Sequence, residues 1–247
     1  KGLPLVMSSP FRFKQFSISQ EYSPMKVGTD SVLLGAWTPA TNPTYILDIG
    51  AGTGVLSLMM AQRFPLSHIH AVELHSLSAK ECRLNVSLSP WHQVVEVFEM
   101  DIRDFASTSA TAYDLIISNP PFFSENTLSP DRVRAMARSN EYLPFSDLLS
   151  CIPLLLAPQG FFSVIIPYRE EESFLQIAME NGLFPTQILH VQGNSLSPIK
   201  RSLLFLSAQE SPLPIAEKLI IEKERHQYTQ EYQELTKNFY LQFQINS

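Results

Sequence analysis

From Tyr45 onward the chain alternates short apolar runs with stretches of helical periodicity. This alternation is typical of β-α-β units, which place parallel strands side by side and connect them through helices. We predict strands at 45–49, 68–74, 94–98, 114–118, 161–166, 187–191 and 202–207. We predict helices between them at 55–64, 76–88, 145–156 and 170–181. The sequence therefore indicates an α/β fold around a parallel sheet.

The chain on either side of this core follows other patterns. The first 43 residues contain five prolines, and the one helical stripe among them, at 32–37, follows Thr29 and Asp30, either of which can cap a helix. The tail shows a short strand pattern at 219–221 and a helical pattern at 228–239. We divide the chain into an N-terminal segment at 1–44, a core domain at 45–210, and a C-terminal extension of strand and helix, packed on the core, at 211–247.

Composition limits the classes of protein to which the chain can belong. The 247 residues are 45% hydrophobic and 17% charged, which is too apolar for a disordered chain. The longest apolar stretches, near 151–158 and 161–167, fall far short of the ~18 residues that span a bilayer. We therefore expect a globular protein with a sizeable core and no membrane segment.

The cysteines, the histidines and the net charge indicate the cellular compartment and limit the kinds of binding site that the chain can carry. Cys82 and Cys151 lie in separate helical patterns and no secretory signal is recognisable, so we expect the reducing cytoplasm. The six histidines show no metal-ligand spacing, and we predict no metal site. A net charge of −6 argues against a general coat for nucleic acid, so any such site must be a local patch.

A cluster of glycines follows the first predicted strand. The chain has only nine glycines, yet three of them fall in Asp48-Ile49-Gly50-Ala51-Gly52-Thr53-Gly54. At a turn from strand to helix, glycine permits positive φ and lets a ligand touch the main chain, and the helix start offers free N–H groups. The dinucleotide fingerprint requires Gly or Ala after Gly54, where Val55 stands. The pattern D-x-G-x-G-x-G instead resembles motif I of the class I methyltransferases that use S-adenosyl-L-methionine (AdoMet).

Two acids follow the next two predicted strands. Glu73 ends the second strand, 19 residues after Gly54, where a carboxylate can accept both hydroxyls of a ribose. Asp101 follows the third strand, and the resemblance implies that it faces the adenine of AdoMet. Taken singly, Glu73 could be a solvated strand end and Asp101 a helix cap. The predicted cofactor-binding residues are Lys26, Thr29, Asp48, Gly50, Gly52, Gly54, Glu73, Leu74, Asp101, Ile102 and Asn119.

The fourth predicted strand of the core leads into Asn119-Pro120-Pro121-Phe122. The prolines fix φ and donate no N–H, so the turn is rigid and displays acceptors. The Asn119 side-chain oxygen and the Pro120 carbonyl can each accept a hydrogen of an exocyclic amine, which draws its nitrogen toward a pyramidal, nucleophilic state. Phe122 can stack on the plane that carries this amine. The alternative is a strand-terminating turn with a buried phenylalanine.

The tetrad is similar to motif IV of amino-group methyltransferases, and we predict Asn119, Pro120, Pro121 and Phe122 as the catalytic residues. Amino-group methyltransferases act on adenine N6, cytosine N4 or the glutamine side-chain nitrogen, and the tetrad alone does not distinguish among these substrates. The stretches 13–16, 25–37, 47–54, 117–122 and 235–241 resemble the bacterial tRNA(Val) adenine-37 N6-methyltransferase family. This family often has tyrosine where Phe122 stands.

The resemblance implies a class I methyltransferase fold, with a seven-stranded, mostly parallel sheet, helices on both faces and an antiparallel last strand. The N-terminal segment is then expected to cover the cofactor and substrate site. The implied activity is AdoMet-dependent N6-methylation of the adenine just 3′ of the anticodon of valine tRNA. The oligomeric state stays undetermined.

Basic residues that could hold tRNA phosphates stand in three places, although surface charge explains each group singly. The predicted RNA-binding residues are Arg12, Lys14, Arg132, Arg134, Arg138, Lys200 and Arg201. Two other functions stay open. One is N5-methylation of glutamine on a translation factor, which usually needs a separate helical recognition domain that 44 leading residues cannot supply. The other is a catalytically silent RNA-binding module, against which the intact glycine motif, Glu73 and Asn119 argue.

Overall fold

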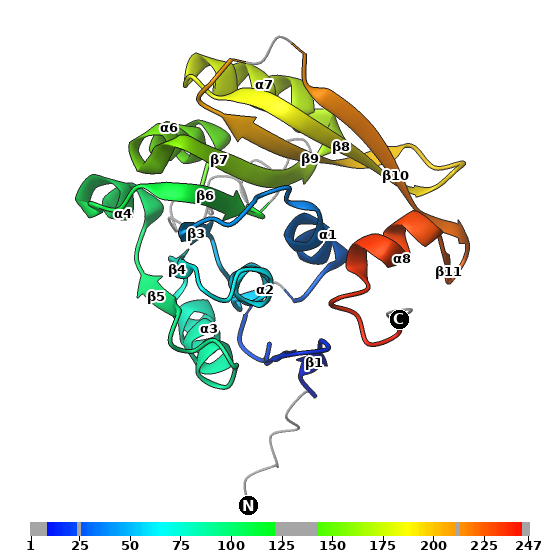
Figure 1. The fold of residues 1–247 in the computed structure, drawn as a ribbon, viewed down its shortest axis with the longest axis horizontal. Coiled ribbons are helices and arrows are strands. Elements are labelled where there is room, and N and C mark those ends of the chain that lie inside the picture. The colour runs from blue at the N-terminus through cyan, green and yellow to red at the C-terminus, as the bar shows by residue number, and fades with distance from the viewer. Residues whose placement is uncertain (1–8, 24–25, 122–142, 211–212, 244–247) are drawn as a thin grey trace, which may run out of the picture.

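The computed structural model describes residues 9–23, 26–121, 143–210 and 213–243. Its main feature is a nine-stranded sheet in the order β11-β10-β8-β9-β7-β6-β3-β4-β5 (Figure 1). The strands are β3 (Tyr45–Ile49), β4 (His68–Glu73), β5 (Val95–Glu99), β6 (Tyr113–Ser118), β7 (Leu156–Pro167), β8 (Phe184–Asn194), β9 (Ile199–Ser207), β10 (Ile215–Glu224) and β11 (Gln227–Tyr228). Strands β3 to β7 run parallel, whereas β9 is antiparallel to both β7 and β8. The predicted α/β fold with an antiparallel seventh core strand is confirmed.

The sheet has two strands more than the predicted seven, because the C-terminal extension continues it. Strand β10 pairs with β8 in parallel and β11 pairs with β10. The sequence predicted only 219–221 as strand here. Along β10 only Leu219 is buried, and the other positions are half-buried or exposed and often charged. Strands near a sheet edge commonly carry such charges, which leave no apolar run to recognise.

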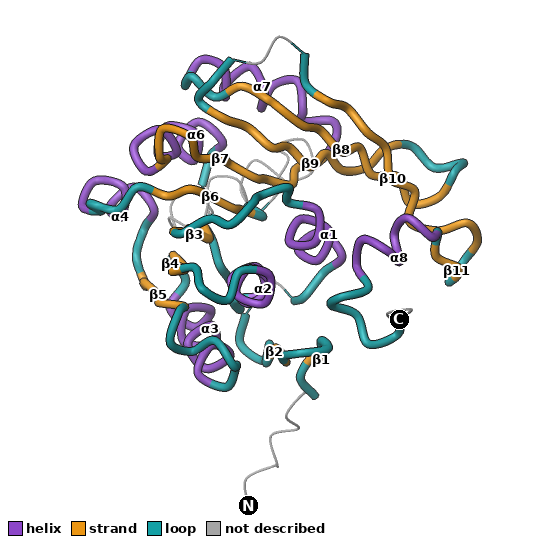
Figure 2. Tube along the Cα trace, viewed as in Figure 1, coloured by secondary structure: helices purple, strands orange, loops and turns teal. Residues whose placement is uncertain are grey.

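Helices cover both faces of the sheet (Figure 2). They are α1 (Thr29–Trp37), α2 (Val55–Arg63), α3 (Ser76–Ser87), α4 (Ile102–Thr108), α6 (Phe145–Leu155), α7 (Glu171–Glu180) and α8 (Gln230–Thr236), with a 3₁₀ turn η1 (Tyr168–Glu170). Neighbouring residues of β3 point to opposite faces, so that Ile46 belongs to the core cluster that contains buried residues of α1, α2, α3 and α8, and Leu47 belongs to the cluster that contains those of α4, α6 and α7. None of the helices in the described ranges is long and apolar enough to cross a membrane.

Three details of the helices differ from the prediction. The helical pattern at 228–239 is a helix only over α8, because Tyr228 belongs to β11 and the chain turns after Thr236. The cap of α1 is Gly28, and the predicted caps Thr29 and Asp30 lie inside its first turn. The short helix α4 was not predicted, because its seven residues give too little periodicity to recognise.

The two ends of the described chain pack together on one face of the sheet. The hairpin of β1 (Phe11–Arg12) and β2 (Ser17–Ile18) precedes α1, and Phe13 forms a bridge with Tyr240. The Phe13 and Tyr240 rings stack with centroids 6.3 Å apart. Phe13 also stacks on Phe16 at 4.5 Å. Phe13 and Phe16 are therefore core residues of the fold.

Candidate active site

The predicted site residues gather at one edge of the sheet. Strands β4, β3 and β6 are neighbours and parallel, with Ile49 beside Val72 on one side and Ser118 on the other. Their carboxyl ends therefore open on the same edge, where parallel sheets bind their ligands. The glycine loop follows β3, which lies between β4 and β6 in the sheet (Figure 1). Glu73 is the last residue of β4, and Asn119 directly follows β6.

The three loop glycines all have positive φ, at +70° for Gly50, +55° for Gly52 and +86° for Gly54. A Cβ added at Gly50 or Gly52 would meet no described atom within 4 Å, so open space adjoins the main chain there. A Cβ at Gly54 would lie 2.8 Å from Sγ of Cys82, because this glycine caps α2 against α3. Gly50 and Gly52 thus leave open space in which a ligand could contact the main chain, whereas Gly54 allows α2 to pack closely against Cys82 of α3.

Replacement of Gly54 by alanine is expected to destabilise the protein more than the same change at Gly182. Both residues have positive φ, at +86° and +72°, but nothing lies within 4 Å of a Cβ at Gly182. Backbone strain alone costs about 1 kcal/mol, and overpacking against Cys82 adds a further ~1–3 kcal/mol. Chemical denaturation of both variants measures the difference, and equal losses would contradict the packing role of Gly54.

Glu73 connects the end of β4 to the glycine loop. Its Oε2 accepts a hydrogen bond from the Gly52 amide at 2.7 Å, and its Oε1 accepts one from the His75 amide at 2.7 Å. A carboxylate oxygen has two lone pairs, so both oxygens can still accept from the hydroxyls of a ribose. The neighbouring Leu74 side chain is 43% exposed and offers an apolar surface beside the carboxylate. Glu73 is therefore held in the loop, and is not a free, solvated strand end.

Asp48 lies beneath the loop. Its side chain is fully buried, and Oδ2 accepts hydrogen bonds from the amide and the hydroxyl of Ser57, at 2.9 and 2.6 Å, in the first turn of α2. Oδ1 has no partner in the described part of the protein. Burial raises the pKa of Asp48 to about 7, and the nearby Glu73 charge acts in the same direction. The Asp48 carboxyl fixes the turn from strand to helix from inside.

Asp48→Asn is expected to change how stability depends on pH. The folded protein keeps the Asp48 proton up to a pKa of about 7, whereas the unfolded chain releases it near 3.8. Between these values the unfolded state binds fewer protons, so the wild type loses stability as pH rises, by at most about 1.4 kcal/mol per pH unit from this group. Unfolding free energies at pH 5 and pH 8 should show the wild type declining relative to Asp48→Asn, and parallel profiles would contradict the assignment.

Asp101 caps α4, which is the alternative role that the sequence left open. Its Oδ1 accepts hydrogen bonds from the backbone amide of Arg103 at 2.8 Å and from Nε of the Arg103 side chain at 2.9 Å. Its Oδ2 accepts one from Nη2 of the same side chain at 2.5 Å. These bonds hold the pKa of Asp101 below its usual value. Ile102 is the buried first residue of α4. A contact of Asp101 and Ile102 with adenine stays a prediction.

Asn119 directly follows β6, and the two polar atoms of its side-chain amide have different surroundings. Nδ2 donates a hydrogen bond to Oγ of Ser31 at 2.9 Å, whereas Oδ1 is buried without a partner among the described residues. The Ser118 hydroxyl donates to the carbonyl of Ile49 at 2.9 Å and ties this strand end to β3. Pro120 is buried and Pro121 half-buried, and Phe122 lies outside the described residues. A buried acceptor without a partner costs about 1–3 kcal/mol, and a ligand N–H removes this cost.

The predicted RNA-binding residues have different surroundings. Arg12 and Lys200 are exposed. The Lys14 ammonium donates to the backbone carbonyls of Lys237 and Phe243, and therefore holds the C-terminal segment. Arg201 donates through Nε to Asp30 of α1 at 2.8 Å, so it connects β9 to α1. Arg132, Arg134 and Arg138 lie outside the described residues.

Two of the predicted cofactor residues stand at the start of α1. Lys26 is exposed and precedes the helix, and Thr29 is its exposed first residue. Sequence reasoning assigned no role to Ser31, Ser57 or Arg103, which contact Asn119, Asp48 and Asp101. The pair Asp48 and Ser57 could have been expected from the turn between them, whereas no local signal marks Ser31.

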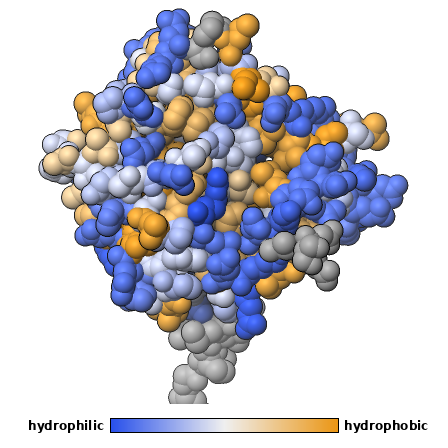
Figure 3. All heavy atoms as spheres, in the orientation of Figure 1, coloured by the Kyte–Doolittle hydropathy of each residue, from blue (hydrophilic) through white to orange (hydrophobic). Residues whose placement is uncertain are grey.

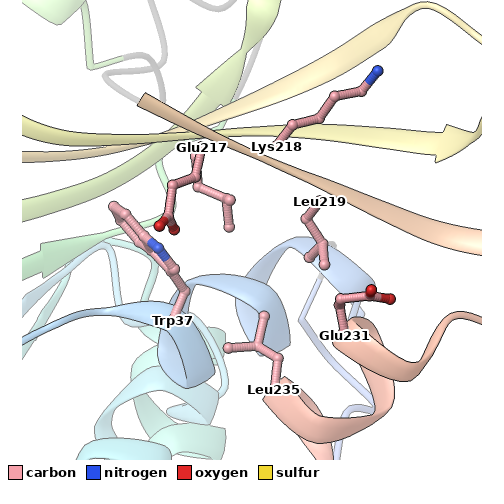
Figure 4. Close-up of a pocket in the computed structure, with 7 residues that line it drawn as sticks. Trp37, Glu217, Lys218, Leu219, Glu231 and Leu235 are labelled. Carbon is pink, nitrogen blue, oxygen red and sulfur yellow. The ribbon is translucent and has the colours of Figure 1, made fainter. Parts of the chain in front are cut away.

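A hollow of about 470 Å³ lies away from this edge, between α1, β10 and α8 (Figure 4). The described residues that line it are Trp37, Leu189, Glu217, Lys218, Leu219, Glu231 and Leu235. None of them is a predicted site residue. On the face shown in Figure 3, apolar side chains form small groups among polar ones.

Comparison with known proteins agrees with this geometry. The family model described as "Methyltransferase small domain" matches residues 18–144. A predicted O-methyltransferase from Agrobacterium tumefaciens has a similar structure, with a TM-score of 0.66 at 17% identity over 85% of this chain and 96% of that one. Fold and glycine loop define a class I methyltransferase, whose methyl donor is AdoMet.

Two curated relatives give the family. A protein of Flavobacterium psychrophilum is 45% identical over 94% of this chain and 99% of its own length. One of Bacteroides fragilis is 42% identical over 95% of this chain and 99% of its own. Both carry the name "tRNA1(Val) (adenine(37)-N6)-methyltransferase". The chain belongs to this family.

Proposed function

We propose that the protein methylates N6 of adenine 37 in valine tRNA, in the cytoplasm, with AdoMet as the donor. The observation that carries this proposal is the buried Asn119 Oδ1, an acceptor without a partner among the described atoms, at the end of β6. An exocyclic amine has two hydrogens to donate and fits such an acceptor. The names of the curated relatives support adenine as the carrier of this amine.

The residues of the sheet edge fit AdoMet. The open main chain at Gly50 and Gly52 leaves room for its methionine end, Glu73 can accept from its ribose hydroxyls, and Asp101 and Ile102 stand where its adenine is expected. The bound cofactor supplies a methyl group on a positively charged sulfur.

Asn119 and Pro120 act on the target amine. Asn119 Oδ1 and the carbonyl oxygen of Pro120 each accept one of its hydrogens, which withdraws the nitrogen lone pair from the ring and makes it nucleophilic. Because the ring of Pro120 locks its own φ and the following Pro121 restricts the ψ of Pro120, the two acceptors keep their spacing without reorganisation. Phe122 is proposed to stack on the adenine. The nitrogen loses its proton after attack, so the mechanism requires no strong general base.

The N-terminal segment at 1–44 is proposed to cover the site of the core domain at 45–210, and the Ser31–Asn119 hydrogen bond supports this. The residues proposed to hold phosphates of the anticodon arm are Arg12, Arg132, Arg134, Arg138 and Lys200. Lys14 and Arg201 have partners within the fold, which favours structural roles for them. The extension at 211–247 is proposed to support this arrangement from the edge of the sheet.

The test is incubation with methyl-labelled AdoMet and unmodified valine tRNA, followed by nucleoside analysis. We expect one N6-methyladenosine per tRNA, none when guanine replaces adenine 37, and a rate that falls as salt weakens the phosphate contacts. A parallel reaction contains translation factors as a source of protein glutamine. Label in protein glutamine, with none in tRNA, would transfer the assignment to a glutamine methyltransferase.

A further inference from the structure

The Asn119 amide has two ends of nearly equal shape and opposite polarity. Rotation of the amide by half a turn exchanges Oδ1, an acceptor, with Nδ2, a donor of two hydrogens. Only Oδ1 can accept a hydrogen bond from a target amine. If Nδ2 faced the amine instead, two hydrogen-bond donors would point at each other. Catalysis by Asn119 therefore requires a neighbour that fixes which end faces the substrate.

Ser31 of α1 is that neighbour in the structure. Its Oγ accepts a hydrogen bond from Asn119 Nδ2 at 2.9 Å. The other polar atom of the amide, Oδ1, is buried and has no partner in the described chain. The reversed amide would place both Nδ2 hydrogens where Oδ1 now lies, and buried N–H groups without partners are rarer in proteins than such carbonyls. The observed polarity is thus the less costly one as long as Ser31 is present.

The fold holds Ser31 in place from both sides. The preceding Asp30 accepts a hydrogen bond from Arg201 of β9 at 2.8 Å, and the following Val32 and Leu33 are buried in the core. Side chains supported in this way lose little freedom when they position a reacting group. Ser31 belongs to the N-terminal segment and Asn119 to the core domain, so the two parts of the chain meet at this hydrogen bond.

We propose that Ser31 is a positioning residue that fixes the polarity of the Asn119 amide, so that the N-terminal segment completes the catalytic site. This inference rests on the proposed role of Asn119 in amine methylation. Its prediction is specific: loss of the Ser31 hydroxyl lowers the rate of methyl transfer through Asn119 and leaves cofactor binding unchanged.

The first experiment measures kcat and KM for valine tRNA, and the AdoMet dissociation constant, in two variants of Ser31. Ser31→Ala is expected to lower kcat about tenfold or more, with KM and AdoMet affinity within twofold of the wild type. Ser31→Thr keeps the hydroxyl and is expected to restore most of the rate. Ser173→Ala, a change in the first turn of α7 at an exposed hydroxyl, is the matched control and should keep the wild-type rate.

The second experiment repeats Ser31→Ala in the Asn119→Asp background. A carboxylate has two equivalent acceptors and no polarity to fix, so the tenfold effect should shrink to less than twofold there. An undiminished effect in that background, or a kcat above half of the wild-type value in Ser31→Ala itself, would overturn the inference. Absence of tRNA methylation by the wild type would instead count against the proposed function, so the two failures are distinguishable.

Discussion

Asn119→Ala is expected to lower kcat for tRNA methylation by at least two orders of magnitude while AdoMet affinity stays within a few-fold of the wild type. The change removes the one side-chain acceptor at the end of β6 that has no partner in the described ranges. Removal of a single preorganised polar group from a transition state costs about 10²–10³ in rate in other enzymes. We expect affinity to be spared because Asn119 is proposed to act on the incoming amine, whereas the cofactor is proposed to lie against Gly50, Gly52 and Glu73. Single-turnover rates with labelled AdoMet, together with calorimetry, measure the two effects separately.

Asn181→Ala is the matched control for this experiment. Asn181 is the C-cap of α7, and its Nδ2 donates to the carbonyl of Ile177 at 2.8 Å, so the variant also loses a half-buried amide and one hydrogen bond. The next strand, β8, begins at Phe184 and has its carboxyl end on the edge that carries Asn119, so Asn181 stands near the opposite edge. Its loss should leave the rate unchanged. Retention of most of the rate by Asn119→Ala would make the tetrad a structural turn and would remove the proposed mechanism.

The position of the site at the sheet edge could be predicted from the sequence because it depends on local patterns. Short apolar runs mark β3, β4 and β6, and a residue directly after a parallel strand must lie at the carboxyl edge. The three glycines of the loop could be recognised for the same reason, since a chain with only nine glycines places three of them in this one turn, where all three have positive φ.

The partners of these residues could not be predicted because they come from distant parts of the chain. Ser31 and Asn119 are 88 positions apart, and Lys14 and the carbonyl of Lys237 are 223 positions apart. The charge pattern predicted that Lys14 and Arg201 bind RNA, because the sequence does not show that a basic side chain has a hydrogen-bond partner elsewhere in the fold. Strand β10 shows the same limit, since its pairing with β8 comes from backbone hydrogen bonds that leave no apolar periodicity.

Glu73→Ala is expected to weaken AdoMet binding by roughly tenfold to a hundredfold, since a hydrogen bond to a charged group is worth ~1.5–3 kcal/mol. Two physical effects contribute to this loss. The ribose hydroxyls lose their acceptor, and the Gly52 amide, which lies 2.7 Å from Oε2, loses the bond that holds the glycine loop open. Glu73→Gln keeps one carbonyl oxygen for one of the two backbone amides, so its affinity should fall between those of the wild type and the alanine variant. Calorimetry with AdoMet and with its demethylated product measures these values, and NAD should bind to none of the three proteins.

Glu99→Ala is the matched control for this loss of charge. Glu99 ends the neighbouring strand β5 in register with Glu73, but its carboxylate accepts a hydrogen bond from Arg83 of α3 at 2.9 Å instead of one from the Gly52 amide. Its replacement removes the same charge from the same edge and should change AdoMet affinity by less than twofold or threefold. A loss equal to that of Glu73→Ala would mean that the general negative field of the edge attracts the positively charged cofactor. Equal affinity of the wild type and Glu73→Ala would remove Glu73 from the site, because no other described carboxylate bonds to the glycine loop amides.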